Sequence, residues 1–134
     1  MREKILGKID ELEGYLEELE SIKPKSFEEY EQIEKKRACE RLLQISVECV
    51  IDICNMIVSE KKLGAPVDEE DIIEKLVKAK IIPESLGEKI REMRGTRNIL
   101  VHKYGYVDDK TIYEILEDNL KDFEEFIDVI LKIK

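Results

Sequence analysis

Apolar residues between Ala38 and Ile57 follow two helical stripes, and this double pattern limits the folds open to the chain. Each stripe advances by three or four residues, which is the spacing of one face of a helix. A helix that is apolar on two sides must be covered on both, by other helices of its own bundle or by a second copy of the chain. The sequence favours both arrangements together. The stripes are Ala38, Leu42, Ile45, Cys49, Ile53 and Met56, and Leu43, Val47, Val50, Cys54 and Ile57.

The rest of the chain supplies the helices that cover this segment. Residues 5–19 form one apolar stripe, and Ser26, Asp68 and Asp108 stand where a side-chain oxygen can cap the first turn of a helix. No segment shows convincing strand alternation. The sequence therefore predicts a single domain over 1–134, folded as an all-α antiparallel bundle of four long helices and one short helix. The expected helices are residues 1–21, 27–62, 68–80, 83–104 and 108–131.

Composition places the chain among soluble globular proteins. Its 134 residues are 43% hydrophobic and 41% charged, and this length has room for one domain with a single core. The three cysteines, Cys39, Cys49 and Cys54, lack the paired short spacings of a zinc site, so we expect them to be reduced core residues. No apolar run approaches the roughly 18 residues of a membrane span, and the N-terminus is too charged for a secretory leader. We expect a cytoplasmic protein without a membrane segment.

Charge is distributed unevenly along the chain. The formal net charge of -9 argues against a surface that coats nucleic acid broadly, since such binding rests on many Lys and Arg contacts to phosphates. Between Glu88 and Tyr104 the balance reverses, because five basic residues oppose two acidic ones, and five minus two leaves an excess of three positive charges. The sequence therefore predicts one basic patch on an acidic body. Its basic members are Lys89, Arg91, Arg94, Arg97 and Lys103.

The run RNILVHKY, residues 97–104, contains the only histidine and interrupts an apolar stripe with polar groups. Arg97 falls where the pattern assigns the interior, while Arg94, Asn98 and His102 lie four apart on one helical face. Arg97 and His102 are about 140° apart around the helix, so a two-fold axis that brings both copies to a shared cleft would suit them. The alternative is that His102 only interacts favourably with the dipole at the C-terminus of its helix and that Arg97 makes an ordinary ion pair.

The run GTRNILVHKYGYVD closely resembles the signature of HepT-like toxins in the HEPN superfamily, which is Arg, four residues, His, one residue, Tyr. Arg97, His102 and Tyr104 match that signature, and RACERLLQISVECVID resembles the family's second helix, so the resemblance spans about 37–131. It implies the toxin component of a type II-like toxin–antitoxin system. The implied activity is that of a metal-independent endoribonuclease without a cofactor, active as a homodimer whose two motifs line the cleft between subunits.

The chemistry of RNA cleavage suits two of these residues. The 2'-hydroxyl attacks the adjacent phosphate, so a site needs a group that exchanges protons near neutrality and a cation that stabilises the crowded phosphate. Imidazole has a reference pKa of about 6.5 and can take either proton role, and guanidinium offers donors matched to phosphate oxygens. His102 and Arg97 are therefore the candidate catalytic residues. The sequence leaves open which proton His102 moves.

Several other residues are candidates for support or substrate binding. Asn98 could orient the imidazole or bind substrate, and Arg94 and Lys103 could hold the RNA backbone. Glu48 and Asp52, four apart on the expected second helix, could pair with Arg97 or shape the cleft. No histidine stands beside these two carboxylates, so we expect no metal site there.

Tyr104 has two interpretations besides that of a buried aromatic. It could stack a base, or, as the resemblance implies, accept a nucleotidyl group from a cognate MntA-like nucleotidyltransferase antitoxin. Adenylate at that position would put negative phosphate beside Arg97 and switch the enzyme off. The alternative function is a non-catalytic helical dimer that binds a nucleotidyltransferase partner or a nucleotide.

Overall fold

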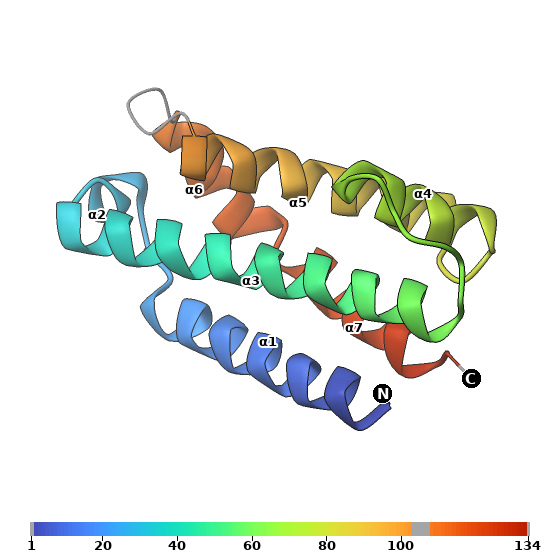
Figure 1. The fold of residues 1–134 in the computed structure, drawn as a ribbon. Helices are drawn as coiled ribbons and strands as arrows, with labels where there is room; N and C mark the ends of the chain where they lie inside the picture. Colours follow the sequence, from blue (N-terminus) through green and yellow to red (C-terminus); the bar gives the residue numbers. More distant parts are fainter. Residues whose placement is uncertain (1, 103–107, 134) are drawn as a thin grey trace.

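The computed structural model describes residues 2–102 and 108–133, and in these residues the chain is helical without a strand (Figure 1). The predicted all-α bundle is confirmed. Lys103, Tyr104 and the three residues that follow them lie outside the described residues. The helices are α1 (Arg2–Ile22), α2 (Phe27–Tyr30), α3 (Ile33–Glu60), α4 (Glu69–Lys78), α5 (Glu84–His102), α6 (Asp109–Asp118) and α7 (Lys121–Leu131).

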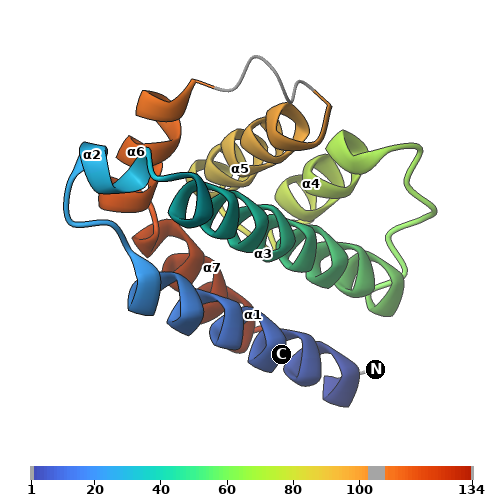
Figure 2. The same cartoon turned by 90° about the vertical axis from the view of Figure 1, so that its left-hand side faces the viewer.

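Helix α3 is the centre of the bundle. It packs against α1 on one side and against α4 and α5 on the other, an arrangement that both Figure 1 and Figure 2 show. The stripe that begins at Leu43 is buried at all five positions, as the sequence predicts. The other stripe is buried only at Cys49 and Ile53, and its first member, Ala38, is exposed. One face of α3 is therefore fully covered within the protomer and the other only in part.

The three cysteines all lie on α3 as free, buried thiols, which confirms the expectation of reduced core residues. Burial raises the pKa of Cys39 to about 11 and that of Cys54 to about 12. A thiol with so high a pKa holds almost no thiolate near neutral pH, and thiolate is the reactive form. Burial and the raised pKa values therefore favour a packing role for the cysteines.

Two of the predicted long helices are each broken once. Residues 27–62 form α2 and α3, because Gln32 adopts the extended backbone angles φ -63° and ψ 126°. The short α2 places the ring of Tyr30 in the core, within 6.2 Å of the Tyr113 ring of α6. The predicted last helix is broken at Asn119, between α6 and α7. Apolar spacing continues across both breaks, so periodicity alone predicted continuous helices.

The helix starts follow the predicted caps. The Ser26 hydroxyl accepts a hydrogen bond from the Glu29 N–H at 3.1 Å, and the Asp68 carboxylate accepts one from the Asp71 N–H at 2.8 Å. Asp108 caps α6 in the same way through the Lys110 N–H at 3.1 Å. Such a cap contributes about 1 kcal/mol and fixes the residue at which a helix begins. The cap at Asp68 is the one that bears on the site, because it sets the first turn of α4.

The expectation about membrane spans was wrong in one respect. Helix α3 is long and apolar enough, by length and composition, to cross a membrane. However, 56% of its most apolar window is buried inside the bundle, as in the core helix of a globular domain. The double stripe explains the apolar content of α3. A helix that is covered by α1 on one side and by α5 on the other requires apolar residues on both sides, as a helix in contact with lipid does.

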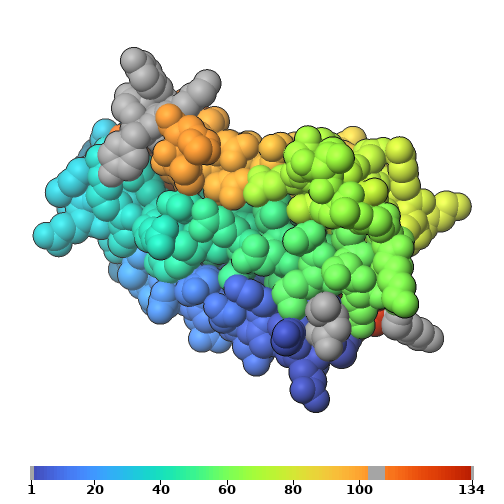
Figure 3. All heavy atoms as spheres, viewed as in Figure 1, coloured from blue at the N-terminus to red at the C-terminus, as the bar shows by residue number. Residues whose placement is uncertain are grey.

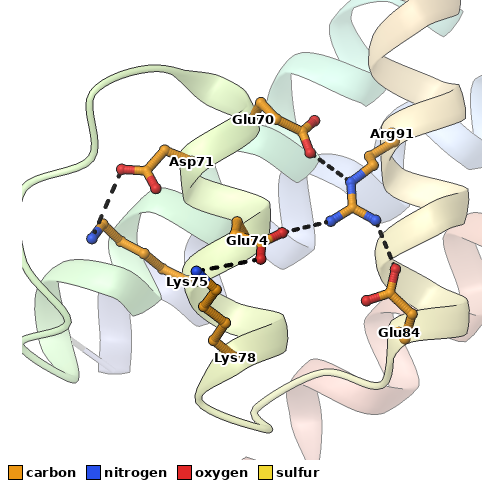
Figure 4. Close-up of polar contacts among 7 residues, drawn as sticks. All are labelled: Glu70, Asp71, Glu74, Lys75, Lys78, Glu84 and Arg91. Atoms are coloured by element: carbon orange, nitrogen blue, oxygen red, sulfur yellow. Dashed lines mark hydrogen bonds and ion pairs between the residues drawn. The ribbon is translucent and has the colours of Figure 1, made fainter.

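Helices α4 and α5 are joined by an arginine and by a close backbone approach. Arg91 of α5 donates to Glu70 at 2.7 Å and to Glu74 at 3.2 Å, both on α4, and to Glu84 of its own helix at 2.9 Å (Figure 4). Gly87 is buried at this junction, where an added Cβ atom would lie 2.7 Å from a methyl carbon of Val77. The two helices therefore meet too closely for a side chain at Gly87.

Gly87→Ala tests this approach, with Gly95→Ala on the same helix as its matched control. Alanine favours a helix by up to about 1 kcal/mol over glycine, but at Gly87 it meets the stiff Val77 side chain, and overpacking costs about 1–3 kcal/mol. Nothing lies within 4 Å of a Cβ atom at Gly95. Urea unfolding should show Gly87→Ala less stable and Gly95→Ala more stable than the wild type. Equal stabilisation by both variants would contradict the close approach.

Candidate active site

An open cleft of about 770 Å³ lies where α3, α4 and α5 meet. Figure 3 presents the face of the molecule on which these three helices lie together. Six of its nine lining residues come from α5, and the others from α3 and from the start of α4. Most of the residues that the sequence singled out are therefore gathered in one place. The lining residues are Glu48, Asp68, Glu69, Arg94, Arg97, Asn98, Ile99, Val101 and His102.

Arg97 is held from three sides. Its side chain is only 11% exposed, in keeping with its place in the apolar stripe. The guanidinium donates to the Asn98 amide oxygen at 2.9 Å and to the Glu69 carboxylate, and it lies 3.9 Å from the Glu48 carboxylate of α3. A guanidinium that reaches acceptors on three helices has a fixed orientation. The structure therefore presents Arg97 as an oriented cation at the wall of the cleft.

Glu69 is a site residue that sequence reasoning missed. It is the first residue of α4, and one of its carboxylate oxygens accepts hydrogen bonds from Arg97 and, at 2.9 Å, from Arg94. In the sequence Glu69 merely adds negative charge to the first turn of a helix, which is its ordinary place. Its partners stand 25 and 28 residues away on another helix, so no local pattern reveals them.

His102 is the last residue of α5, and its side chain is exposed. It lines the same cleft as Arg97, and Asn98 stands one turn before it. The cleft therefore holds an exposed imidazole together with an oriented guanidinium. Lys103 and Tyr104, which follow it in the sequence, lie outside the described residues.

The two acidic candidates on α3, Glu48 and Asp52, have different partners. Glu48 lines the cleft, and its carboxylate also accepts a hydrogen bond from the Gln44 amide at 3.3 Å. Asp52 pairs instead with Lys8 of α1 at 3.6 Å. Within the described protomer Asp52 therefore makes its ion pair away from Arg97 and is not among the residues that line this cleft. Residues four apart drift by about 40° around a helix, enough here for them to face different neighbours.

The basic patch predicted from the sequence is neutralised in the described residues. Arg91, Arg94 and Arg97 all pair with carboxylates of α4, and Lys89 donates to Glu125 of α7 at 2.7 Å. Counting charge along the chain misses acidic residues that other helices bring in. The cleft itself holds three carboxylates and two guanidinium groups, so three minus two leaves one negative charge while His102 is neutral.

A second hollow, of about 560 Å³, lies between α1 and the α6–α7 region and is lined by six carboxylates and two lysines. Burial raises the pKa of Glu124 there, and Glu13, Asp128 and Glu20 raise it further. Carboxylates that disfavour one another's charge make a poor surface for a phosphate. The hollow at Arg97 is therefore the better candidate for a site that binds RNA, although both hollows are open and of similar size.

Comparison with known proteins agrees with the family that the sequence resembles and with the fold. The profile of the Ribonuclease HepT-like family matches residues 12–130. The mRNA nuclease HepT of Shewanella oneidensis is 36% identical over 88 residues, which are 66% of this chain and 66% of that protein. The tRNA nuclease HepT of Aphanizomenon flos-aquae is 28% identical over 114 residues, or 84% of this chain and 78% of that one.

The fold also matches solved structures. The tri-AMPylated HEPN toxin of Shewanella oneidensis, in complex with an MNT antitoxin, superposes with a TM-score of 0.91 at 27% identity, over 98% of each chain. A related MntA–HpeT toxin–antitoxin structure gives a TM-score of 0.87 at 27% identity, over 95% of this chain and 97% of that one. This chain therefore belongs to the Ribonuclease HepT-like family of the HEPN superfamily.

Proposed function

We propose that this protein is the toxin of a type II-like toxin–antitoxin system and a metal-independent endoribonuclease. The observation that carries the proposal is the oriented Arg97 beside the exposed His102 in one cleft. The family match and the two nuclease relatives support the same activity. A single HepT-like domain over 1–134 and a cytoplasmic location, away from any membrane, belong to the proposal, since RNA and nucleotide donors are found there.

The proposed reaction is an internal transfer at phosphorus. The 2'-oxygen of one nucleotide forms a bond to the adjacent phosphorus, and the bond from phosphorus to the 5'-oxygen of the next nucleotide breaks. One proton leaves the 2'-hydroxyl and one is taken up by the departing 5'-oxygen. His102 carries one of these protons, and Arg97 stabilises the additional negative charge on the phosphate oxygens. Arg94 and Lys103 hold the RNA backbone.

Asn98 and Glu48 act through Arg97. The Asn98 amide oxygen accepts from the Nε–H of Arg97, which leaves the two outer guanidinium nitrogens for Glu69 and Glu48. Glu48 approaches from α3, on the opposite side from Glu69 of α4. Groups that keep a cation oriented before the substrate arrives reduce the reorganisation needed during the reaction. We assign both residues a positioning role.

A homodimer belongs to the proposal. Ile99 and Val101, on the cleft-lining part of α5, are 42% and 39% exposed, and Val67, next to Asp68, is 86% exposed. Large apolar side chains around a charged cleft are typical of a surface that a second copy covers. A two-fold axis beside α5 would also bring the second Arg97 and His102 to the same cleft. The proposed active site is therefore shared between two subunits.

The proposed antitoxin is an MntA-like nucleotidyltransferase that modifies Tyr104. The support is the tri-AMPylated relative in complex with an MNT antitoxin, together with the position of Tyr104 two residues after His102 in the sequence. The tyrosine oxygen would attack the α-phosphate of ATP and release pyrophosphate. The adenylate would add negative charge and bulk close to Arg97 and His102, which opposes binding of an RNA phosphate.

One observation favours a second candidate function. The cleft is negative by one charge while His102 is neutral, and its two guanidinium groups are already paired. Such a cleft suits a non-catalytic dimer that binds a nucleotidyltransferase partner or a nucleotide. RNA cleavage by the purified protein in the presence of a chelator distinguishes the two functions.

His102→Ala is the first test of the enzyme. Loss of a proton carrier lowers the rate by about a hundredfold or more, whereas loss of an exposed side chain leaves the fold intact. Cleavage of RNA should be measured with EDTA present, and the mass of the assembly by light scattering. A wild type that cuts RNA and a dimeric variant that does not are the expected results. A wild type that cuts nothing would favour the binding module.

Glu48→Gln and Asp52→Asn form a matched pair one helical turn apart. Glu48→Gln should lower kcat about two- to fivefold, because a partly exposed ion pair that orients Arg97 is weakened. Asp52→Asn should leave kcat within about twofold, since its partner is Lys8. Single-turnover cleavage of one RNA by both variants measures this. Equal losses would contradict the different orientation of the two carboxylates.

Incubation with a cognate nucleotidyltransferase and ATP tests the switch. Intact mass should rise by whole adenylate units, and RNA cleavage by the same sample should stop, because phosphate groups then oppose substrate binding. Tyr104→Phe should keep its cleavage activity and gain no mass. Modification of Tyr104→Phe to the wild-type extent would contradict the assignment of Tyr104.

A further inference from the structure

The contact between Glu69 and the arginines of α5 has a consequence for substrate binding. One carboxylate oxygen of Glu69 accepts from Arg94 at 2.9 Å and also from Arg97. Carboxylate and phosphate oxygens bind guanidinium with the same paired geometry. In the described structure Glu69 therefore stands at the donors to which a phosphate of RNA would bind.

The charge of the cleft also favours displacement of Glu69 by a phosphate. A phosphate that joined the cleft without displacing Glu69 would add a negative charge to a site that already holds three carboxylates and two guanidinium groups. Like charges brought together in a partly buried site oppose binding. If the phosphate replaced Glu69 at the arginines, two cations would face one phosphate, and Glu48 and Asp68 would be the two remaining carboxylates of the cleft. Replacement of Glu69 by the phosphate is therefore electrostatically more favourable than addition of the phosphate beside Glu69.

The surroundings of Glu69 allow its side chain to move while its helix stays in place. The Glu69 side chain is 35% exposed, so its carboxylate can turn into solvent. Helix α4 is held independently by Arg91, which binds Glu70 and Glu74 of that helix (Figure 4). Arg97 keeps Asn98 and Glu48 as partners after the exchange. The cation therefore stays oriented when Glu69 leaves.

We propose that Glu69 is an internal competitor of the RNA phosphate, which must displace it from Arg94 and Arg97 before the substrate is bound. This inference rests on the proposed ribonuclease function and adds a residue that sets substrate affinity. Glu69 weakens the binding of RNA and takes no part in the chemical step. Removal of its charge should therefore lower Kd and KM and leave kcat unchanged.

The test uses Glu69→Gln, with Glu70→Gln as its matched control. Both variants remove one negative charge from the first turn of α4, but Glu70 binds Arg91 and does not line the cleft. Binding is measured by fluorescence anisotropy of a labelled 2'-O-methyl RNA, which has no free 2'-hydroxyl and so cannot be cut by the proposed reaction. Cleavage of the matching unmodified RNA gives KM and kcat.

Glu69→Gln should bind the RNA about fivefold more tightly than the wild type, the range of one partly exposed ion pair. The slope of log Kd against log salt should match that of the wild type, because the same phosphate contacts form in both proteins once Glu69 is displaced. KM should fall by the same factor as Kd, with kcat within about twofold. Glu70→Gln should match the wild type in Kd, salt slope, KM and kcat. Glu69→Ala, which removes the acceptor altogether, should act in the same direction as Glu69→Gln.

Other outcomes overturn the inference. A lower kcat with unchanged Kd in Glu69→Gln would make Glu69 a residue that holds Arg97 in place. An equal gain in Glu70→Gln would make the effect one of overall charge. The binding arm also separates this inference from the proposed function: if the wild type cuts no RNA but Glu69→Gln binds the 2'-O-methyl RNA more tightly, only the ribonuclease assignment fails. Equal binding by wild type and variant overturns the competition at Glu69.

Discussion

The two-sided burial of α3 is the constraint on which the rest of the structure depends. A helix with apolar residues on opposite sides requires cover from both, and α1 supplies one side while α4 and α5 supply the other. The cleft forms on the second side, where Glu48 of α3 lies beneath the junction of α4 and α5. The partial exposure of the other stripe, at Ala38 and its neighbours, shows that the protomer does not cover all of α3 by itself. The location of the site is thus a result of the packing.

Much of this fold could be predicted from local sequence, because its determinants are local. The stripe of residues 5–19 and the caps at Ser26, Asp68 and Asp108 involve residues within one turn of each other, and the structure has them where they were expected. The breaks at Gln32 and Asn119 were missed, since apolar spacing runs through them. The cause at Gln32 is tertiary: the turn there allows Tyr30 to be buried against the Tyr113 ring of α6.

Some residues of the candidate site could likewise be predicted from the sequence, and others could not. Arg97 and His102 could be found because one helix carries both and because the motif resembles that of a known family. Glu69 could not, because its contact with Arg97 joins two helices across 28 residues. The neutralisation of the predicted basic patch was missed for the same reason, because a count of charges along α5 leaves out the carboxylates of α4. Sequence reasoning thus found the candidate residues Arg97 and His102, which line one cleft, and missed the carboxylates that set their electrostatic environment.

The three arginines of α5 show how that environment assigns different roles to one residue type. Arg91, Arg94 and Arg97 are spaced by three, and all reach carboxylates of α4. Arg91 has three carboxylate partners and lies outside the cleft, so its ion pairs join α4 to α5. Arg97 is more buried, at 11% exposed against 26%, and it shares its nearest carboxylate with Arg94. Burial of a guanidinium costs desolvation energy that shared partners offset poorly. A mostly buried arginine with a shared carboxylate gains when an anion that can bridge both arginines takes the place of that carboxylate, and a phosphate that displaces Glu69 would do so.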